Sequence, residues 1–504
     1  MPILLIFGIV IISIYDMNRS VISQQVVETT TMSMSDSDGS EESVTSYIDA
    51  LIKAPLLVSQ STLVGMVFTQ IVFSKILHTR ILVNYDSPSP NSDIMHLDLG
   101  IAKRLVLILI VSVVALIVSA TSLFILQVYN LSSELGLGFS DTLSILLNTS
   151  IGTIWLLRIV TSVLILVLTI TYYIIVRRDV YSKKHGKNSI SISRISYVIL
   201  CAILISGSIN LISNSMVSHN AAAEFLPWLA ISIDWFHVMA VSIWLGGLFY
   251  LSLILLYAIR ISSMGLDHRM DNSNKMENQI IIRNSFSLAI MLPYFSMIAI
   301  ICLGIIGISG LYMAWLQIQS AESLFDSLYG NILILKLCVI APMIALGAYH
   351  QIKLHYVMVR TAQRRNKIQE QSEILLDTKP KKWSRDPHTN RTDRYDPFMR
   401  FSKTIKIESL IGIAVLTVSA FLTITSPPSM VQSHSQMQMS GSELGNNNFG
   451  GSVDGDEGKT IPKITDGFTI AALALATIVL IMSIYYYRKN KQELKTTINL
   501  LKTK

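Results

Sequence analysis

Charged residues are scarce in this chain, and their scarcity excludes an ordinary soluble protein. Asp, Glu, Lys and Arg make up 14% of the 504 residues, against about a quarter in a typical soluble domain. Hydrophobic residues make up 51%, and the mean hydropathy is +0.51. We therefore expect a polytopic membrane protein. The net charge of +7 gives no reason to expect a nucleic-acid partner, because the basic residues gather in particular loops.

Cysteine is almost as scarce. The chain has three cysteines, Cys201, Cys302 and Cys338, and all of them fall inside apolar runs. An odd number without zinc or redox spacing gives no disulfide framework. Two interpretations stay open, namely small packing side chains and a thiolate ligand for a soft metal.

Motifs for energy coupling are also lacking. The segment GDEGKT at 455–460 resembles the end of a phosphate-binding loop, but Val453 stands where that motif requires its first glycine. The sequence contains no Asp-Lys-Thr-Gly phosphorylation motif. We therefore expect neither ATP hydrolysis nor any other enzymatic activity.

Apolar runs are what the chain has in abundance. Runs of roughly 20 residues recur, which is the length that crosses about 30 Å of hydrocarbon as a helix. They lie at 55–77, 105–128, 152–176, 195–217, 228–259, 286–317, 329–352, 405–425 and 467–487. The predicted fold class is all-α, a polytopic transmembrane helical bundle.

These runs predict how the chain is organised. The core is expected to comprise a four-span half at 55–217 and a second four-span half at 218–428, followed by a C-terminal span at 467–487. The connecting segments are a polar extracytoplasmic tail at 16–54, a basic cytoplasmic loop at 353–404, an extracytoplasmic loop at 429–466 and a basic tail at 488–504. Residues 1–15 have the length of a signal h-region but lack its flanking charge and a small-residue cleavage site, so a signal and a short anchor both stay open.

The loops alternate in charge, and this alternation predicts the orientation in the cell membrane. The loops at 129–151, 218–227 and 318–328 contain no Lys or Arg, whereas the loops between them are basic. The positive-inside rule places the basic loops and the C-terminus in the cytoplasm. Glycosylation acceptor patterns at Asn130 and Asn148 fall on the predicted outer side.

Ionisable residues enter the run 228–259 near its outer end. Asp234 precedes His237 by three residues, so both lie on one helical face. At 1.5 Å per residue they sit about 9 Å and about 14 Å below the outer edge. His219 lies at the outer end of the preceding run, three residues after Met216, so one helical face could carry both as metal ligands. An ionisable group in hydrocarbon is costly and typically functional, so we favour a site over a packing histidine.

Two cations, Arg158 and Lys336, enter the predicted membrane at a similar depth. We expect one of them to pair with Asp234, because an unpaired charge at this depth is costly. A buried ion pair that only fixes helix packing explains both cations as well, and a lysine can also extend to the membrane surface. Glu408, near the inner end of the run 405–425, is expected to be a helix-packing residue.

The predicted outer loop 429–466 contains the segment SMVQSHSQMQMSG, which brings together Met430, His434, Met437 and Met439. Methionine has no core to fill in such a polar segment. Thioether and imidazole groups select soft Cu(I), although a compositional accident in a chain with 21 Met stays open. Methionines within the runs are expected to pack: Met239, Met313 and Met343.

Several stretches resemble the copper resistance protein D (CopD) family of membrane copper-transport proteins. The most specific are DWFHVMAVSIWLGGLFYL at 234–251, SLYGNILILKLCVIAPMIALGAYH at 327–350, and IESLIGIAVLTVSAFLTITSPP at 407–428. Weaker stretches lie at 149–159, 218–223 and 309–318. The resemblance implies copper movement between the cell exterior and the cytoplasm. It matches His219, His237 and Lys336, and Asp234 less closely.

The chain departs from the longer members of that family in two respects. We expect no N-terminal copper-binding β-sandwich, because the tail 16–54 is short and polar. The ninth run and its Met/His loop are additional. An extracytoplasmic copper-binding protein is therefore a candidate partner.

The resulting hypothesis is a copper permease. Copper, the transported or bound ion, would be captured by the four Met and His residues of the loop 429–466 and passed to His219 and His237, with Asp234 orienting the imidazole or balancing charge. One alternative is an assembly or sensor protein that holds copper without transport. Another is an intramembrane haem protein, which needs two imidazoles at one depth, whereas His350 and His355 fall at the opposite end.

Overall fold

The computed structural model describes most of the predicted core. It covers residues 41–80, 91–184, 190–218, 227–255, 274–318, 321–350 and 397–428, with five single positions between 481 and 492. The predicted segment 1–15, the loop 429–466 and the predicted ninth span lie outside the described residues, apart from those single positions.

The described part of the chain is helical and contains no strand, which confirms the all-α prediction. Eight helices are long and apolar enough to cross a membrane, matching the first eight predicted runs. They are α2 (Glu41–Arg80), α3 (Asn91–Leu135), α5 (Ser150–Lys184), α6 (Ile190–Ser215), α7 (Pro227–Phe249, extended by the π-helix η2, Tyr250–Leu255), α9 (Asn274–Gln317), α11 (Leu328–Tyr349) and α13 (Pro397–Leu422).

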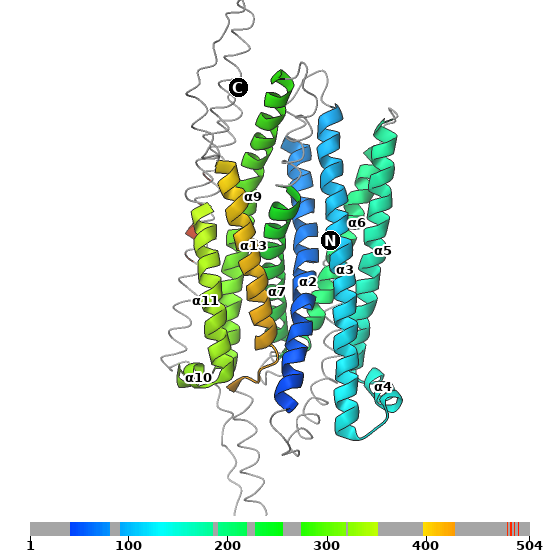
Figure 1. Ribbon diagram of the computed structural model, residues 1–504, viewed down its shortest axis with the longest axis vertical. Helices are drawn as coiled ribbons and strands as arrows, with labels where there is room; N and C mark the ends of the chain where they lie inside the picture. The colour runs from blue at the N-terminus through cyan, green and yellow to red at the C-terminus, as the bar shows by residue number, and fades with distance from the viewer. Residues whose placement is uncertain are drawn as a thin grey trace, which may run out of the picture.

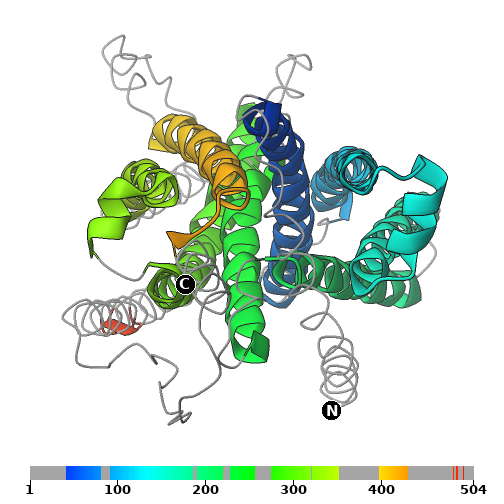
Figure 2. The ribbon, with the colours of Figure 1, turned by 90° about the horizontal axis from the view of Figure 1, so that it is seen from below.

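The eight helices run side by side, with α2 and α7 packed together in the middle. Helices α3, α5 and α6 lie on one flank, and α9, α11 and α13 lie on the other (Figures 1 and 2). Two short helices, α4 (Phe139–Leu147) and α10 (Ala321–Asp326), lie at the same end of the bundle (Figure 1). We call this end the α4 end. It is the end that carries the loops without Lys or Arg.

The central pair of helices is held by a close contact between small residues. A Cβ atom on Gly65 of α2 would lie 1.9 Å from the carbonyl oxygen of Ser242 and 2.6 Å from Cα of Gly246, both on α7. The Ser242 hydroxyl donates to the hydroxyl of Ser61 at 3.3 Å. Small residues that let two backbones approach are typical of helix pairs in membranes. The Trp-Leu-Gly-Gly sequence at 244–247 therefore serves this packing.

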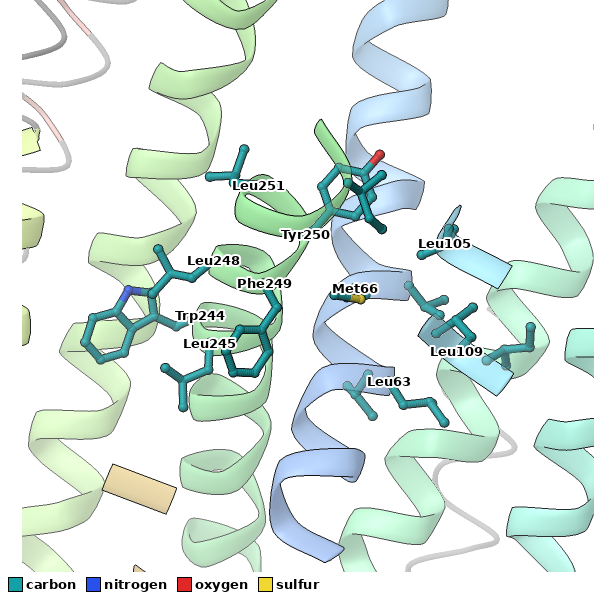
Figure 3. Packing of buried hydrophobic residues seen from close by; sticks show 14 of the residues in the cluster. Leu63, Met66, Leu105, Leu109, Trp244, Leu245, Leu248, Phe249, Tyr250 and Leu251 are labelled. Carbon is teal, nitrogen blue, oxygen red and sulfur yellow. The ribbon is translucent and has the colours of Figure 1, made fainter. Parts of the chain in front are cut away.

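Larger apolar side chains fill the space around the crossing. Figure 3 shows Leu63 and Met66 of α2 lying between Leu105 and Leu109 of α3 on one side and the side chains of α7 on the other. Large apolar side chains also lie exposed on the outer face of α3. They recur at helical spacing: Leu107, Val111, Val114 and Val118. An apolar stripe on the outside of a bundle suits contact with lipid.

Helix α2 begins earlier than the sequence predicts. The first span was expected at 55 after a polar tail, but the apolar part of α2 runs from Tyr47 to Ser74. Asp49 and Lys53 attract each other at this end of the helix. Opposite charges four residues apart on a helix offset each other, which lets a segment with two charges enter the bundle.

Candidate functional site

Helix α7 carries the two ionisable residues that the sequence singles out. Its apolar composition and the proline at its first position favour a helix from Pro227 onward. Asp234 is buried, with 9% of its surface exposed, and His237 is half-buried. Their neighbour Phe236 is 54% exposed on the outer face. Asp234 and His237 thus point into the bundle.

Ser309 of α9 holds the imidazole of His237. The distance between Nδ1 of His237 and Oγ of Ser309 is 2.9 Å, and the Ser309 hydroxyl donates to the carbonyl oxygen of Ile305 at 2.5 Å. A serine hydroxyl has one proton, so the imidazole must be the donor in its contact with Ser309. Nδ1 therefore carries the ring proton, and the lone pair of Nε2 remains available to a ligand.

Gly310 makes room for this ring. A Cβ at position 310 would lie 3.5 Å from Cε1 of His237 and 3.9 Å from Nδ1. The imidazole thus lies directly against the backbone of α9, one residue after the serine that orients it. Ser309 and Gly310 open the stretch 309–318 that resembles the CopD family, but nothing in the sequence links them to His237, because serine and glycine are common in membrane helices and only the fold brings them there.

Charges from two other helices act on the ionisable residues of α7. Asp234 attracts Lys53 of α2 and Lys336 of α11. Lys336 also acts electrostatically on His237. Asp234, His237 and Lys336 thus lie within electrostatic range of one another. The sequence prediction places Lys53 in the polar tail 16–54. Its four-residue spacing from Asp49 could have indicated a helix whose two opposite charges offset each other inside the bundle.

Near the start of α11, the Tyr329 hydroxyl donates to Oε1 of Gln317 and so ties α11 to α9, and Asp234 acts electrostatically on Tyr329. The Ser327 side chain accepts a hydrogen bond from the backbone N–H of Gly330 at 3.0 Å and caps α11. A Cβ on Gly330 would lie 2.1 Å from the carbonyl oxygen of Leu324. The SLYG sequence therefore positions the start of the helix that carries Lys336.

Arg158 is buried on the other flank and binds the end of α6. Its Nε donates to Oγ of Ser213 at 3.0 Å. Its Nη2 donates to the carbonyl oxygen of Ser213 at 3.1 Å and to Oδ1 of Asn214 at 2.9 Å. A cation suits the carbonyl end of a helix, and the guanidinium also lies 4.4 Å from the ring centre of Trp155. These contacts join α5 to α6.

A pair of amides extends these contacts to α2. Gln60 donates to Oδ1 of Asn210 at 2.7 Å and accepts from Nδ2 of Asn214 at 2.5 Å. Asn210 in turn donates to the carbonyl oxygen of Arg158 at 3.0 Å. Satisfied polar networks of this kind rigidify a helix bundle.

The remaining predicted ligands are not brought together by the described structure. Met216 is buried in the core at the end of α6, with 2% of its surface exposed. Five of them lie outside the described residues: His219, Met430, His434, Met437 and Met439. Within the described part of the chain, no three His, Cys, Asp or Glu residues form a group that could hold a metal ion.

The cysteines lie on three different helices of the described structure. Cys201 of α6 is half-buried, Cys302 of α9 is buried and Cys338 of α11 is exposed, and all three are free thiols. None of the contacts described for His237 or Asp234 involves a cysteine.

Comparison with known proteins finds a family match in the second half of the chain. Residues 289–422 match the family described as Copper resistance protein D. The chain is also similar to the copper transport protein CutJ of Bacillus subtilis (strain 168), with 28% identity over 219 residues. That alignment covers 43% of this chain and 29% of the relative, so the chain spans less than a third of that protein's length. No solved structure matches the chain.

The family match includes Ser309 and Lys336, whereas Asp234 and His237 precede it. The flank formed by α9, α11 and α13 is thus the part that the comparison identifies. The chain is a multi-pass membrane protein with eight helices long and apolar enough to cross a membrane among its described residues, and residues 289–422 of it match the copper resistance protein D family.

Proposed function

We propose that this protein transports copper across the cell membrane through a site centred on His237. The supporting observation is the hydrogen bond that orients its ring, because Ser309 accepts from the N–H at Nδ1 and Nε2 keeps a lone pair for a ligand. Neutral imidazole is a good ligand for copper. A hydrogen bond from the second ring nitrogen, as here to Ser309, orients a ligating imidazole.

Asp234 balances charge in this proposal. Two lysines, Lys53 and Lys336, are attracted to the carboxylate. Without Asp234 the region around His237 would repel a cation. The carboxylate therefore lowers the electrostatic cost of bringing a copper ion next to the imidazole.

Copper reaches the site from the α4 end. This end carries the loops without basic residues, so the positive-inside rule assigns it to the extracytoplasmic side and assigns the C-terminus to the cytoplasm. The segment with Met430, His434, Met437 and Met439 lies on the extracytoplasmic side in this orientation, and its thioether and imidazole groups suit capture of soft Cu(I). His219 takes part in the transfer inward. An extracytoplasmic copper-binding protein is the proposed donor.

The experiment is copper uptake into lipid vesicles that contain only this protein. Vesicles with the wild-type chain should accumulate Cu(I) faster than protein-free vesicles, with a rate that saturates as copper increases. Phe236→Leu changes a neighbouring side chain that faces outward and should retain uptake. Copper that binds to the protein without entering the vesicles would contradict transport and would instead indicate a copper-holding assembly or sensor protein.

The haem alternative finds no support in the described histidines. His237 lies near the start of α7 at the α4 end, whereas His350 lies at the other end of α11. Two imidazoles must face one another at one depth to ligate a haem iron from both sides. These two therefore do not form such a pair.

A further inference from the structure

Helix α11 carries a regular stripe of four side chains on one face. The helix lies at the outer edge of its flank, next to α13 (Figure 2). The four residues follow one another at intervals of seven, so they stay on nearly the same face of the helix. We call them the inner stripe: Tyr329, Lys336, Met343 and His350, the residue that follows α11. Tyr329, Met343 and His350 are buried, and Lys336 is half-buried.

Several aliphatic residues of α11 face the other way. Leu335, Leu337 and Ile344 have 53%, 58% and 40% of their surface exposed. A helix that only packed against its neighbours would bury such residues. Polar side chains that face the interior of a membrane bundle are typical of ion paths. The residue types on the two faces of α11 therefore indicate more than packing.

The outer half of the inner stripe reaches the region of His237. The Tyr329 hydroxyl donates to Gln317 of α9. Lys336 is attracted to Asp234 of α7 and acts electrostatically on His237. The stripe thus begins beside the residues proposed to receive copper.

The inner half of the stripe ends at α13. Nε2 of His350 lies 2.6 Å from Oγ1 of Thr404, and Nδ1 lies 3.0 Å from Oε2 of Glu408. The backbone of α11 comes close to that of α13 and stands farther from those of α7 and α9. The stripe therefore extends from the α4 end of the bundle to the opposite end, along the side of α11 that faces other helices.

Met343 lies halfway along the stripe, in an apolar layer. At 1.5 Å per residue it is about 10.5 Å from both Lys336 and His350. Helices α7, α11 and α13 meet here, because a Cβ on Gly412 would lie 2.5 Å from Cδ2 of Leu245 and 3.6 Å from Cε of Met343. The thioether of Met343 thus lies between the polar groups at the two ends.

We propose that the inner stripe of α11 lines the path of the copper ion through the bundle, and that the thioether of Met343 carries the ion across the apolar layer. This inference rests on the proposed transport function. An ion surrounded by aliphatic groups alone is costly, whereas a thioether is a suitable ligand for soft Cu(I). A single thioether holds the ion briefly, as passage requires.

The first test is Cu(I) uptake into vesicles that contain the full chain with Met343→Leu. Leucine keeps the apolar volume and removes the sulfur, so the thermal midpoint should change little. The uptake rate should fall about tenfold or more, as when one interaction with the moving ion is lost. Met66→Leu is the matched control, because Met66 is a fully buried methionine of α2 packed toward α3 (Figure 3). It should retain the wild-type rate.

A double variant separates the sulfur from the packing of the layer. Met343→Leu combined with Leu245→Met returns a thioether to the same layer, because both side chains lie next to Gly412. Uptake should recover in part relative to Met343→Leu alone. An absence of recovery, at an unchanged thermal midpoint, would contradict the role of the sulfur.

The second test measures access from water and needs no copper. Met343→Cys and Ile344→Cys are made separately in a chain whose three native cysteines are replaced by alanine. A charged methanethiosulfonate that does not cross lipid is added to vesicles that contain each chain. The thiol at position 343 should react, whereas the thiol at position 344, on the exposed face, should not, because only a thiol in contact with water ionises and reacts.

The two tests distinguish this inference from the transport proposal. Copper uptake by the wild-type chain, with an unchanged rate in Met343→Leu and an unreactive thiol at position 343, would support transport and reject this path. If the wild-type chain takes up no copper while the thiol at position 343 reacts, the transport proposal fails and the water-accessible face of α11 stands.

Discussion

His237 of α7 and Ser309 of α9 form a contact of 2.9 Å between Nδ1 and Oγ, and the Ser309 hydroxyl proton goes to the carbonyl oxygen of Ile305. This relationship places the ring proton on Nδ1 and leaves the lone pair on Nε2. It also links α7 to the part of the chain that matches the CopD family, because Ser309 lies within residues 289–422.

Ser309→Ala should weaken copper binding without unfolding the bundle. The variant removes the acceptor that fixes the imidazole, and losing such an orienting partner costs about 10–100-fold in metal affinity. Copper titration of the purified chain measures the effect. Ser232→Ala is the matched control, because the Ser232 hydroxyl donates only to the carbonyl oxygen of Trp228 in its own helix. Equal affinities for the two variants would contradict the role of Ser309.

Asp234→Asn should lower copper affinity, because Lys53 and Lys336 then lose the carboxylate that attracts both. The double variant Asp234→Asn with Lys336→Met should recover part of the loss, since it removes one of the uncompensated cations. The copper affinities of Asp234→Asn, of Lys336→Met and of the double variant together give the coupling energy between positions 234 and 336. Purely additive effects on copper affinity would show that the carboxylate does not act through Lys336.

Arg158→Lys should destabilise the bundle and leave copper affinity unchanged. Lysine lacks the planar group that binds Ser213 and Asn214 together. Leaving buried partners unsatisfied costs about 1–3 kcal/mol, which thermal unfolding in detergent would show as a lower midpoint. A loss of copper binding at an unchanged midpoint would instead place Arg158 in the metal site.

Gly246→Ala should separate the two central helices. The added Cβ would lie 2.5 Å from Cα of Gly65 and 2.5 Å from the carbonyl oxygen of Ser61, both backbone atoms of α2. Overpacking of this kind costs about 1–3 kcal/mol and should lower the thermal midpoint. Gly138→Ala is the control, since only a side-chain oxygen of Asp141, at 3.5 Å, lies near that position. Equal midpoints for the two variants would contradict the close crossing.

Met437→Ala combined with Met439→Ala should weaken uptake only at low copper. These residues are proposed to concentrate the ion before it enters the bundle, so their loss matters little once copper is abundant. Uptake rates across a range of Cu(I) concentrations measure the effect, which should appear as a higher concentration for half-maximal uptake. A fall in the maximal rate would place these methionines in the transport path itself.

The positions of the helices could be predicted because the membrane imposes a length and a composition on every span. The three-residue spacing of Asp234 and His237 also indicated that they share a face. A common depth for Asp234 and Lys336 required an added assumption, and it stays a prediction, although the two side chains attract each other.

Contacts between distant helices could not be read from the sequence. Ser309 and Glu408 carry no local pattern, and their partners His237 and His350 are 72 and 58 residues away in the chain. The predicted first span begins at residue 55, whereas the apolar part of α2 begins at Tyr47. A hydropathy average counts Asp49 and Lys53 as two separate unfavourable charges, although the two attract each other in the structure. The packing role of Gly246 likewise depends on a partner, Gly65, in another helix.

The most direct test of the proposed transport is the initial rate of Cu(I) uptake into vesicles that contain either the wild-type chain or His237→Ala, at equal protein content and with equal thermal midpoints. The proposed role of Nε2 predicts that the alanine variant takes up copper no faster than protein-free vesicles. Uptake by His237→Ala at the wild-type rate would contradict that role and remove His237 from the copper path.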